Sequence, residues 1–135
     1  MENELATKVL IIDDDQSVYE TLKLVLEPHS FQVAIATSAK QAIELVKTDP
    51  PEVIIIDLHL PRMDCCTLTA KIRAYTQTPI LILSAVNKPD LVVQALEKGA
   101  DEYLSKPVPG NVLVAHLNRL TRRARAEVLT QSYTL

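Results

Sequence analysis

Glycine is nearly missing from this sequence, which has only Gly99 and Gly110 among its 135 residues. Glycine-rich phosphate loops of the P-loop or dinucleotide-binding kind need several closely spaced glycines, so both kinds are excluded. Cysteine is equally scarce, because Cys65 and Cys66 are the only two and are adjacent. Adjacent cysteines rarely form a disulfide, and a lone pair offers too few ligands for zinc. We therefore expect two free structural thiols in a reducing compartment.

Long apolar runs and an excess of basic charge are also missing. No apolar stretch approaches the roughly 20 residues that span a bilayer, and the acidic start of the chain does not resemble a signal peptide. The net charge of −3 argues against general binding to nucleic acids or membrane surfaces. We therefore expect a cytoplasmic protein without membrane contact, and 135 residues with 47% hydrophobic content suffice for one globular domain.

Five short apolar runs are present, each followed by a segment with apolar residues at helical spacing. The runs, which predict strands buried on both faces, are Lys8–Ile12, Phe31–Ala36, Val53–Ile56, Ile80–Ser84 and Glu102–Lys106. The segments, which predict helices, are Gln16–Glu27, Ala39–Val46, Cys65–Tyr75, Asp90–Lys98 and Pro109–Ala126. This alternation predicts an α/β fold of the (βα)5 kind, a doubly wound, five-stranded parallel sheet with helices on both faces.

Residues at the predicted helix ends fit this fold. Asp15 and Ser38 are expected to cap the first two helices, because their side-chain oxygens can accept hydrogen bonds from the free amides there. Gly99 is expected as the C-cap of the fourth helix. Asp15 as a metal ligand is the less favoured alternative.

Reactive side chains follow or end four of the five predicted strands. Asp13 and Asp14 follow the first strand, Asp57 the third and Lys106 the fifth, while Ser84 ends the fourth. The carboxyl ends of parallel strands share one edge of the sheet, where open α/β folds bind ligands. Clustered carboxylates repel one another unless a cation neutralises them, and oxygen ligands suit Mg²⁺ (or Mn²⁺) with a phosphate oxygen as co-ligand. The edge therefore suits phosphoryl transfer onto Asp57 as the nucleophile.

Residues 7 to 123 resemble the receiver domain of a two-component response regulator, which has a flavodoxin-like fold. The residues that carry the resemblance are, in chain order, Asp13, Asp14, Asp57, Leu58–Asp64, Ser84, Gly99–Tyr103 and Lys106 with Pro107. Each match is weak alone, but all of them occur in order and at the family's spacing. The resemblance implies a signalling switch rather than an enzyme, in which Asp57 accepts a phosphoryl group from a sensor histidine kinase with Mg²⁺ as cofactor.

The resemblance also implies how the metal would be bound. Asp14, Asp57 and the backbone carbonyl of His59 would be ligands, and Asp13 would act largely through water. Cys65 stands where the family usually has glycine, which puts the local loop conformation in doubt without affecting the phosphorylation residues.

Four further residues have roles that the resemblance implies. Lys106 would pair with the phosphoryl oxygens, and its bond to Pro107 would be a cis peptide. Ser84 would move toward the phosphoryl group, and Tyr103 would turn inward behind it. This movement would change the face formed by the fourth helix, fifth strand and fifth helix.

That face is also where OmpR/PhoB-like transcriptional regulators form their active dimer. The residues at the corresponding positions here are Val92, Asp101, Glu102, Val112, His116 and Arg122, with Arg123 as an alternative to Arg122. Val92 and Val112 both stand where the group has partners of one ion pair, so an apolar contact would replace it.

Three parts of the chain are expected: an N-terminal extension (1–6), the receiver domain (7–123) and a helix extension or linker (124–135). We expect the linker to lead to an effector domain that binds DNA, since the receiver itself would not. A stand-alone or phosphorelay receiver is the alternative.

Two other functions are less favoured by the sequence. Asp13–Ser17 nearly fits the nucleophile motif of haloacid-dehalogenase-like phosphatases, in which Asp13 would be the nucleophile. The chain is short for that class and lacks its late acidic motif. A receiver-like module that is never phosphorylated is the other alternative, but no residue of the acidic pocket is missing.

Overall fold

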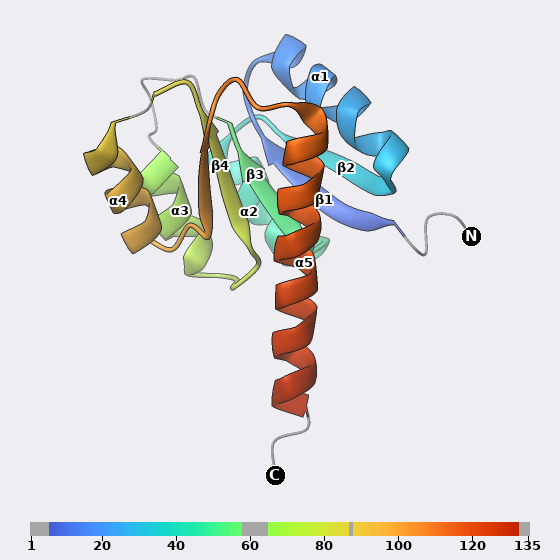
Figure 1. The fold of residues 1–135 in the computed structure, drawn as a ribbon. Helices are drawn as coiled ribbons and strands as arrows, with labels where there is room; N and C mark the ends of the chain where they lie inside the picture. Colours follow the sequence, from blue (N-terminus) through green and yellow to red (C-terminus); the bar gives the residue numbers. More distant parts are fainter. Residues whose placement is uncertain (1–5, 58–64, 87, 133–135) are drawn as a thin grey trace.

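The computed structural model describes residues 6–57, 65–86 and 88–132, with the backbone alone for 128–132. Five parallel strands form one sheet in the order β2-β1-β3-β4-β5 (Figure 1). The strands are β1 (Thr7–Ile12), β2 (Phe31–Ala36), β3 (Val53–Ile56), β4 (Ile80–Ser84) and β5 (Glu102–Ser105). The helices are α1 (Gln16–Leu26), α2 (Ala39–Thr48), α3 (Cys65–Arg73), α4 (Pro89–Glu97) and α5 (Gly110–Ser132), with a short 3-10 helix, η2 (Glu27–His29), after α1. The predicted (βα)5 doubly wound sheet is confirmed.

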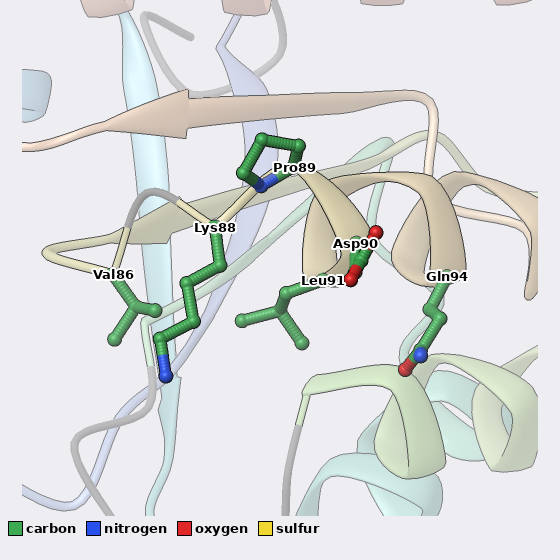
Figure 2. Close-up of a pocket in the computed structure, with 6 residues that line it drawn as sticks. All are labelled: Val86, Lys88, Pro89, Asp90, Leu91 and Gln94. Atoms are coloured by element: carbon green, nitrogen blue, oxygen red, sulfur yellow. The ribbon is translucent and has the colours of Figure 1, made fainter.

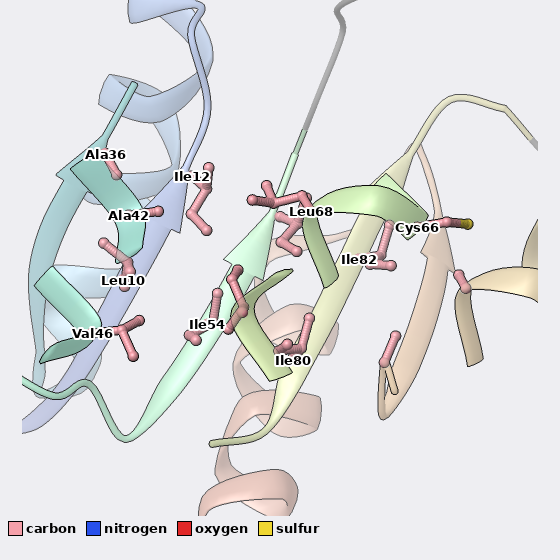
Figure 3. Close-up of a cluster of buried hydrophobic side chains, with 14 residues drawn as sticks. Leu10, Ile12, Ala36, Ala42, Val46, Ile54, Cys66, Leu68, Ile80 and Ile82 are labelled. Atoms are coloured by element: carbon pink, nitrogen blue, oxygen red, sulfur yellow. The ribbon is translucent and has the colours of Figure 1, made fainter. Parts of the chain in front are cut away.

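Helices cover both faces of the sheet because alternate strand residues point to opposite sides. On one side, Leu10, Ile54 and Ile80 pack with residues of α2, α3 and α4, as Figure 3 shows for this cluster. On the other side, Ile11 and Ile55 pack with residues of α1 and α5. The central strands are therefore buried on both faces, which is why they consist of continuous apolar runs.

The predicted helix caps are present. The Asp15 side chain accepts from the Ser17 amide at 2.9 Å, and the Ser38 hydroxyl accepts from the Gln41 amide at 3.1 Å. Lys98 rather than Gly99 is the C-cap of α4, and Gly99 follows it with φ at +116°. That conformation is the reason for the glycine, since other residues rarely adopt it.

Three predicted helix ends differ from the structure by more than one residue, and the first is the end of α2, which is Thr48 rather than Val46. Helix α3 ends at Arg73 rather than Tyr75, and α5 continues to Ser132, beyond the predicted end at Ala126. No glycine or proline follows Gly110, so nothing in the local sequence stops α5.

Among the described residues, no helix has the length and apolar character needed to cross a bilayer.

Candidate functional site

The carboxyl edge of the sheet brings Asp13 and Asp57 to neighbouring positions. Strands β1 and β3 pair in register at Ile12 and Ile56, so the next residue of each strand enters the same region. The Asp57 amide donates to the Ile12 carbonyl at 3.0 Å, which extends the strand ladder to the carboxylate residue itself. Both aspartates are buried, with exposed fractions of 0% for Asp13 and 1% for Asp57. Two carboxylates are thus held out of bulk water on rigid backbone.

Lys106 supplies a positive charge at this edge. Its backbone amide donates to the Ser84 carbonyl at 2.8 Å, which fixes the residue directly after β5. Its Nζ lies 2.8 Å from Asp57 Oδ1, and the lysine side chain is 26% exposed. The peptide bond between Lys106 and Pro107 is cis. Burying a carboxylate without a paired cation destabilises a fold, and Lys106 supplies a cation within ion-pair distance of Asp57.

Asp13 and Asp14 differ in their surroundings. Asp13 Oδ1 accepts from the Asp15 amide at 2.9 Å, whereas the Asp14 side chain is exposed. Asp15 itself caps α1, as predicted in preference to a role as metal ligand. The acidic loop after β1 therefore holds one buried and one exposed carboxylate.

The donor atoms of this edge fit a hard divalent cation. Among the described residues, no three side chains of His, Cys, Asp or Glu form a group that could hold a metal alone. Mg²⁺ does not need such a group, because it is usually bound by one or two carboxylates, waters and a phosphate. Asp13 and Asp57 supply carboxylate oxygens of that kind. The predicted carbonyl ligand, His59, lies outside the described residues.

The Val86 backbone connects the two predicted switch residues. The Ser84 hydroxyl accepts from the Val86 amide at 3.0 Å, and the Tyr103 hydroxyl donates to the Val86 carbonyl at 2.8 Å. Sequence reasoning selected Ser84 and Tyr103 but not this backbone link, which no side-chain pattern can signal. A pocket beside the link is lined by Val86, Lys88, Pro89, Asp90, Leu91 and Gln94 (Figure 2). The end of β4 and the start of α4 are therefore coupled to β5.

Known proteins with similar sequences and structures agree on the family. A model of the response regulator receiver domain matches residues 9–118. The transcriptional regulatory protein SrrA of Staphylococcus aureus is 34% identical over 128 residues, which cover 95% of this chain and 53% of SrrA. The crystal structure of a two-component response regulator from Clostridium difficile matches with a TM-score of 0.82 at 32% identity, covering 87% of this chain and 98% of that one. The chain belongs to the response regulator receiver family.

One solved structure and the length of SrrA limit what this membership implies. The receiver domain of a signal transduction histidine kinase from Syntrophus aciditrophicus matches with a TM-score of 0.77 at 30% identity, covering 87% of this chain and 91% of that one. Receivers thus occur in kinases as well as in regulators. The chain spans about half the length of SrrA, the curated relative named above. Membership establishes a receiver of two-component signalling, while the output stays a proposal.

The predicted dimer face of the receiver holds some of its charges within the molecule. Both Glu102 carboxylate oxygens lie 3.0 Å from His116 Nδ1, and Arg119 forms an ion pair with the same carboxylate. Arg119 was missed in the sequence, although it lies three residues after His116 and therefore on the same helix face. Arg122, which was selected, is exposed.

The remaining predicted residues of this face are one further acidic residue and several apolar side chains. Asp101 forms an ion pair with Arg73, away from Glu102 and His116. Among the side chains that the structure describes on α4 and α5, the large apolar ones that are exposed are Val93 (51%), Leu96 (43%) and Val112 (39%), and Val92 is half-buried. Helices α4 and α5 therefore expose apolar side chains, while Glu102 and Asp101 are paired within the molecule.

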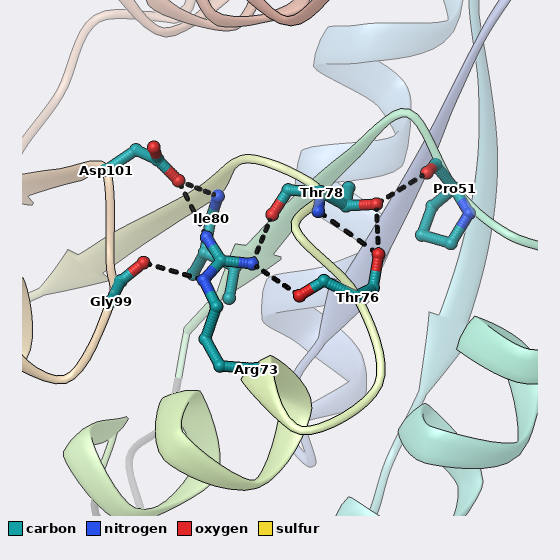
Figure 4. Close-up of polar contacts among 7 residues, drawn as sticks. All are labelled: Pro51, Arg73, Thr76, Thr78, Ile80, Gly99 and Asp101. Carbon is teal, nitrogen blue, oxygen red and sulfur yellow. Dashed lines mark hydrogen bonds and ion pairs between the residues drawn. The ribbon is translucent and has the colours of Figure 1, made fainter.

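Arg73 organises the opposite edge of the sheet (Figure 4). Its guanidinium donates to the carbonyls of Gly99 at 2.9 Å, Thr76 at 3.2 Å and Thr78 at 2.6 Å, and to the Asp101 carboxylate at 2.9 Å. The same Asp101 oxygen accepts from the Ile80 amide at 2.8 Å. Burial lowers the pKa of Arg73, and the charge of Asp101 opposes that shift. Arg73 thus joins the loops before β4 and β5.

Proposed function

We propose that Asp57 accepts a phosphoryl group from a phosphohistidine of a sensor histidine kinase. An Asp57 carboxylate oxygen attacks phosphorus, the nitrogen–phosphorus bond breaks, and an acyl phosphate forms. The observation that carries this proposal is the buried Asp57 carboxylate, 2.8 Å from Lys106 Nζ and beside Asp13 on rigid strand ends. Such positioning and charge neutralisation are what phosphoryl transfer requires of a protein. Cys65 and Cys66 are not joined in a disulfide, which favours a reducing compartment such as the cytoplasm.

The residues proposed to hold Mg²⁺ are Asp14, Asp57 and the carbonyl of His59, with Asp13 acting through water. When bound, Mg²⁺ would neutralise negative charge on the transferred phosphoryl oxygens. Asp13 and Asp57 supply the buried carboxylates of the pocket, and the ammonium of Lys106 lies next to Asp57 Oδ1. These residues orient the reaction, and the kinase supplies the phosphoryl group.

Phosphorylation is proposed to act through Ser84, Val86 and Tyr103. A phosphoryl group on Asp57 offers a charged acceptor to which the Ser84 hydroxyl can donate. Turning toward it would carry the Ser84 oxygen away from the Val86 amide, from which that oxygen now accepts. Tyr103 is tied to the carbonyl of the same residue, so a shift of Val86 changes the position of the tyrosine. The local charge is thereby converted into a change of the α4-β5-α5 face.

The proposed output is control of transcription by a DNA-binding effector domain. SrrA is a transcriptional regulatory protein by name and is about twice as long as the matched region, which leaves room for such a domain there. The receiver itself has a net charge of −3 and is not expected to bind DNA. A stand-alone or phosphorelay receiver remains the second candidate, since one structural match is a receiver of a kinase.

A homodimer through the α4-β5-α5 face is proposed as the form that reads the switch. Val92, Val93 and Leu96 on α4 and Val112 on α5 offer apolar area, while Glu102 is already paired with His116 and Arg119. An apolar contact at Val92 and Val112 would depend little on salt, unlike a contact between exposed ion pairs.

The phosphatase alternative is not favoured by the surroundings of Asp15. In that mechanism the second aspartate of the Asp-x-Asp motif must face the substrate, whereas Asp15 caps α1.

Incubation with a small-molecule phosphodonor, followed by measurement of the intact mass, tests whether Asp57 is a phosphoacceptor. We expect a single phosphoryl group that requires Mg²⁺ and is lost slowly. Steady release of phosphate over many turnovers would contradict the proposal.

A further inference from the structure

Helix α5 extends well beyond the part of the chain that forms the receiver core. The family match ends at residue 118, but α5 continues to Ser132. Figure 1 shows the end of α5 projecting past the sheet, on the side opposite the carboxyl edge. Among the side chains described, the last buried ones of α5 are Leu120 and Thr121. The described side chains after Thr121, residues 122–127, are exposed or half-buried. A helical segment with so little packing is expected to fray, because short isolated helical segments are marginal in water.

Arg125 contacts the sheet one turn after the last buried residue. Its Nε lies 3.1 Å from Glu52 Oε2, and its Nη2 also pairs with that oxygen. Nη2 lies 3.5 Å from the hydroxyl of Thr7 as well. Thr7 begins β1, and Glu52 directly precedes β3. Arg125 thus joins α5 to the starts of two central strands that are distant in the sequence.

Glu52 is itself held in place at this edge. Its amide donates to the Lys8 carbonyl at 2.9 Å, and the Lys8 amide donates to Glu52 Oε1 at 3.4 Å. Lys8 Nζ in turn pairs with Asp49 Oδ1 at 2.5 Å. One carboxylate oxygen of Glu52 therefore faces β1 and the other faces α5. The partner of Arg125 is thus a partly exposed side chain whose backbone belongs to the strand ladder and whose carboxylate also contacts β1.

We propose that the Arg125–Glu52 pair clamps α5 to the amino edge of the sheet. The clamp makes the helix beyond Thr121 part of the same rigid body as the receiver. It thereby sets the direction in which the chain leaves the domain. Because the pair lies at the edge opposite Asp57, the clamp is independent of phosphoryl transfer. This inference does not rest on the proposed function.

Hydrogen–deuterium exchange of the whole chain, read by mass spectrometry, tests the clamp. In Arg125→Ala, we expect amides from about residue 122 to 132 to exchange about two- to five-fold faster, the range of a solvent-exposed ion pair. Arg123→Ala is the matched control, because Arg123 is an exposed arginine of the same helix and the change in helix propensity is identical. We expect exchange in this control to match the unchanged protein.

Two further variants test the clamp from the other side. Glu52→Gln should accelerate exchange in the same segment, and the exchanged pair Glu52→Arg with Arg125→Glu should restore slow exchange. Phosphorylation of Asp57 should be unchanged in all of them, which separates a failed clamp from a failed phosphoacceptor. Equal exchange in Arg125→Ala and Arg123→Ala, or acceleration that the exchanged pair does not reverse, would overturn the inference.

Discussion

The two edges of the sheet treat charge in opposite ways. At the carboxyl edge, Asp13 and Asp57 are buried almost completely, and Lys106 approaches Asp57 from β5. At the amino edge, the ion pairs of Glu52 and Arg125 lie on partly exposed side chains and connect elements to one another. Buried charges at the first edge need close partners, whereas exposed ion pairs at the second edge contribute little each and connect elements of the fold. The proposed phosphoacceptor site and the contacts that join helices and loops to the sheet thus lie at opposite ends of the strands.

Arg73 is the exception that links burial with structure at the amino edge. Its side chain is only 15% exposed, yet its partners are mostly backbone carbonyls. The hydrogen bonds of Arg73 to these carbonyls hold the loops before β4 and β5 in place. Arg73 thus differs from Asp57 in its partners, which are mainly backbone carbonyls for Arg73 and a lysine side chain for Asp57.

The largest expected effect comes from removing the carboxylate at the reactive edge. Asp57→Asn should abolish phosphorylation by a small-molecule phosphodonor, because the amide cannot form an acyl phosphate. Asp49→Asn, which removes an exposed carboxylate paired with Lys8 at the amino edge, is the control and should be phosphorylated normally. Intact mass spectrometry reads both. Undiminished phosphorylation of Asp57→Asn would show that Asp57 is not the phosphoacceptor and that the carboxyl edge does not have the proposed role.

Loss of the buried arginine should have the largest effect on stability. Arg73→Ala removes a guanidinium with four partners and leaves three partly buried carbonyls without this donor, so we expect a loss of about 3 kcal/mol. Urea unfolding followed by circular dichroism measures this. Arg123→Ala, at an exposed position, should change stability by less than about 0.5 kcal/mol. A similar small change for both variants would show that the Arg73 network does not hold the loops.

Removing Lys106 should affect both the stability of the fold and the chemistry at Asp57, because it is the ion-pair partner of Asp57. Lys106→Met leaves the Asp57 carboxylate without this cation, and we expect a loss of about 2 kcal/mol, less than for fully buried pairs because Lys106 is 26% exposed. Adding Asp57→Asn should recover this loss, since the uncompensated charge disappears with it. The same urea titrations apply. Additive losses in the double variant would mean that the two residues are not energetically coupled.

The smallest expected effect concerns the proposed dimer face. Val112→Lys should weaken self-association of the phosphorylated receiver about ten-fold, because a charge enters an apolar contact. Leu24→Lys, at an apolar position on α1 that is 73% exposed, is the control. Sedimentation at low and high salt measures both. Dissociation by salt alone would indicate an ionic interface instead of an apolar one.

The sheet and most of its reactive edge were predictable because they follow from local signals. Apolar runs mark the strands, and a residue placed directly after a parallel strand must lie at the carboxyl edge. That reasoning brought together Asp13, Asp57 and Lys106, whose positions the structure describes. It did not indicate that Asp14 is exposed while Asp13 is buried, since two adjacent residues of a loop cannot be told apart by spacing.

The amino edge was not predictable for a physical reason. Arg73 and Arg125 resemble ordinary basic residues near helix C-termini, and their partners are distant in sequence. Their contacts depend on how loops and helices pack after the sheet has formed. The length of α5 was underestimated for a different reason, since no glycine or proline follows Gly110 and the sequence past Ala126 gives no signal for where the helix ends.

Mapping the phosphorylated residue tests directly whether Asp57, at the carboxyl edge, is the phosphoacceptor. The chain would be phosphorylated with Mg²⁺ and a small-molecule phosphodonor, digested, and sequenced by tandem mass spectrometry. The separation of the two edges predicts a single acyl phosphate on Asp57. A phosphoryl group on Asp13, or on a residue of the amino edge, would contradict it.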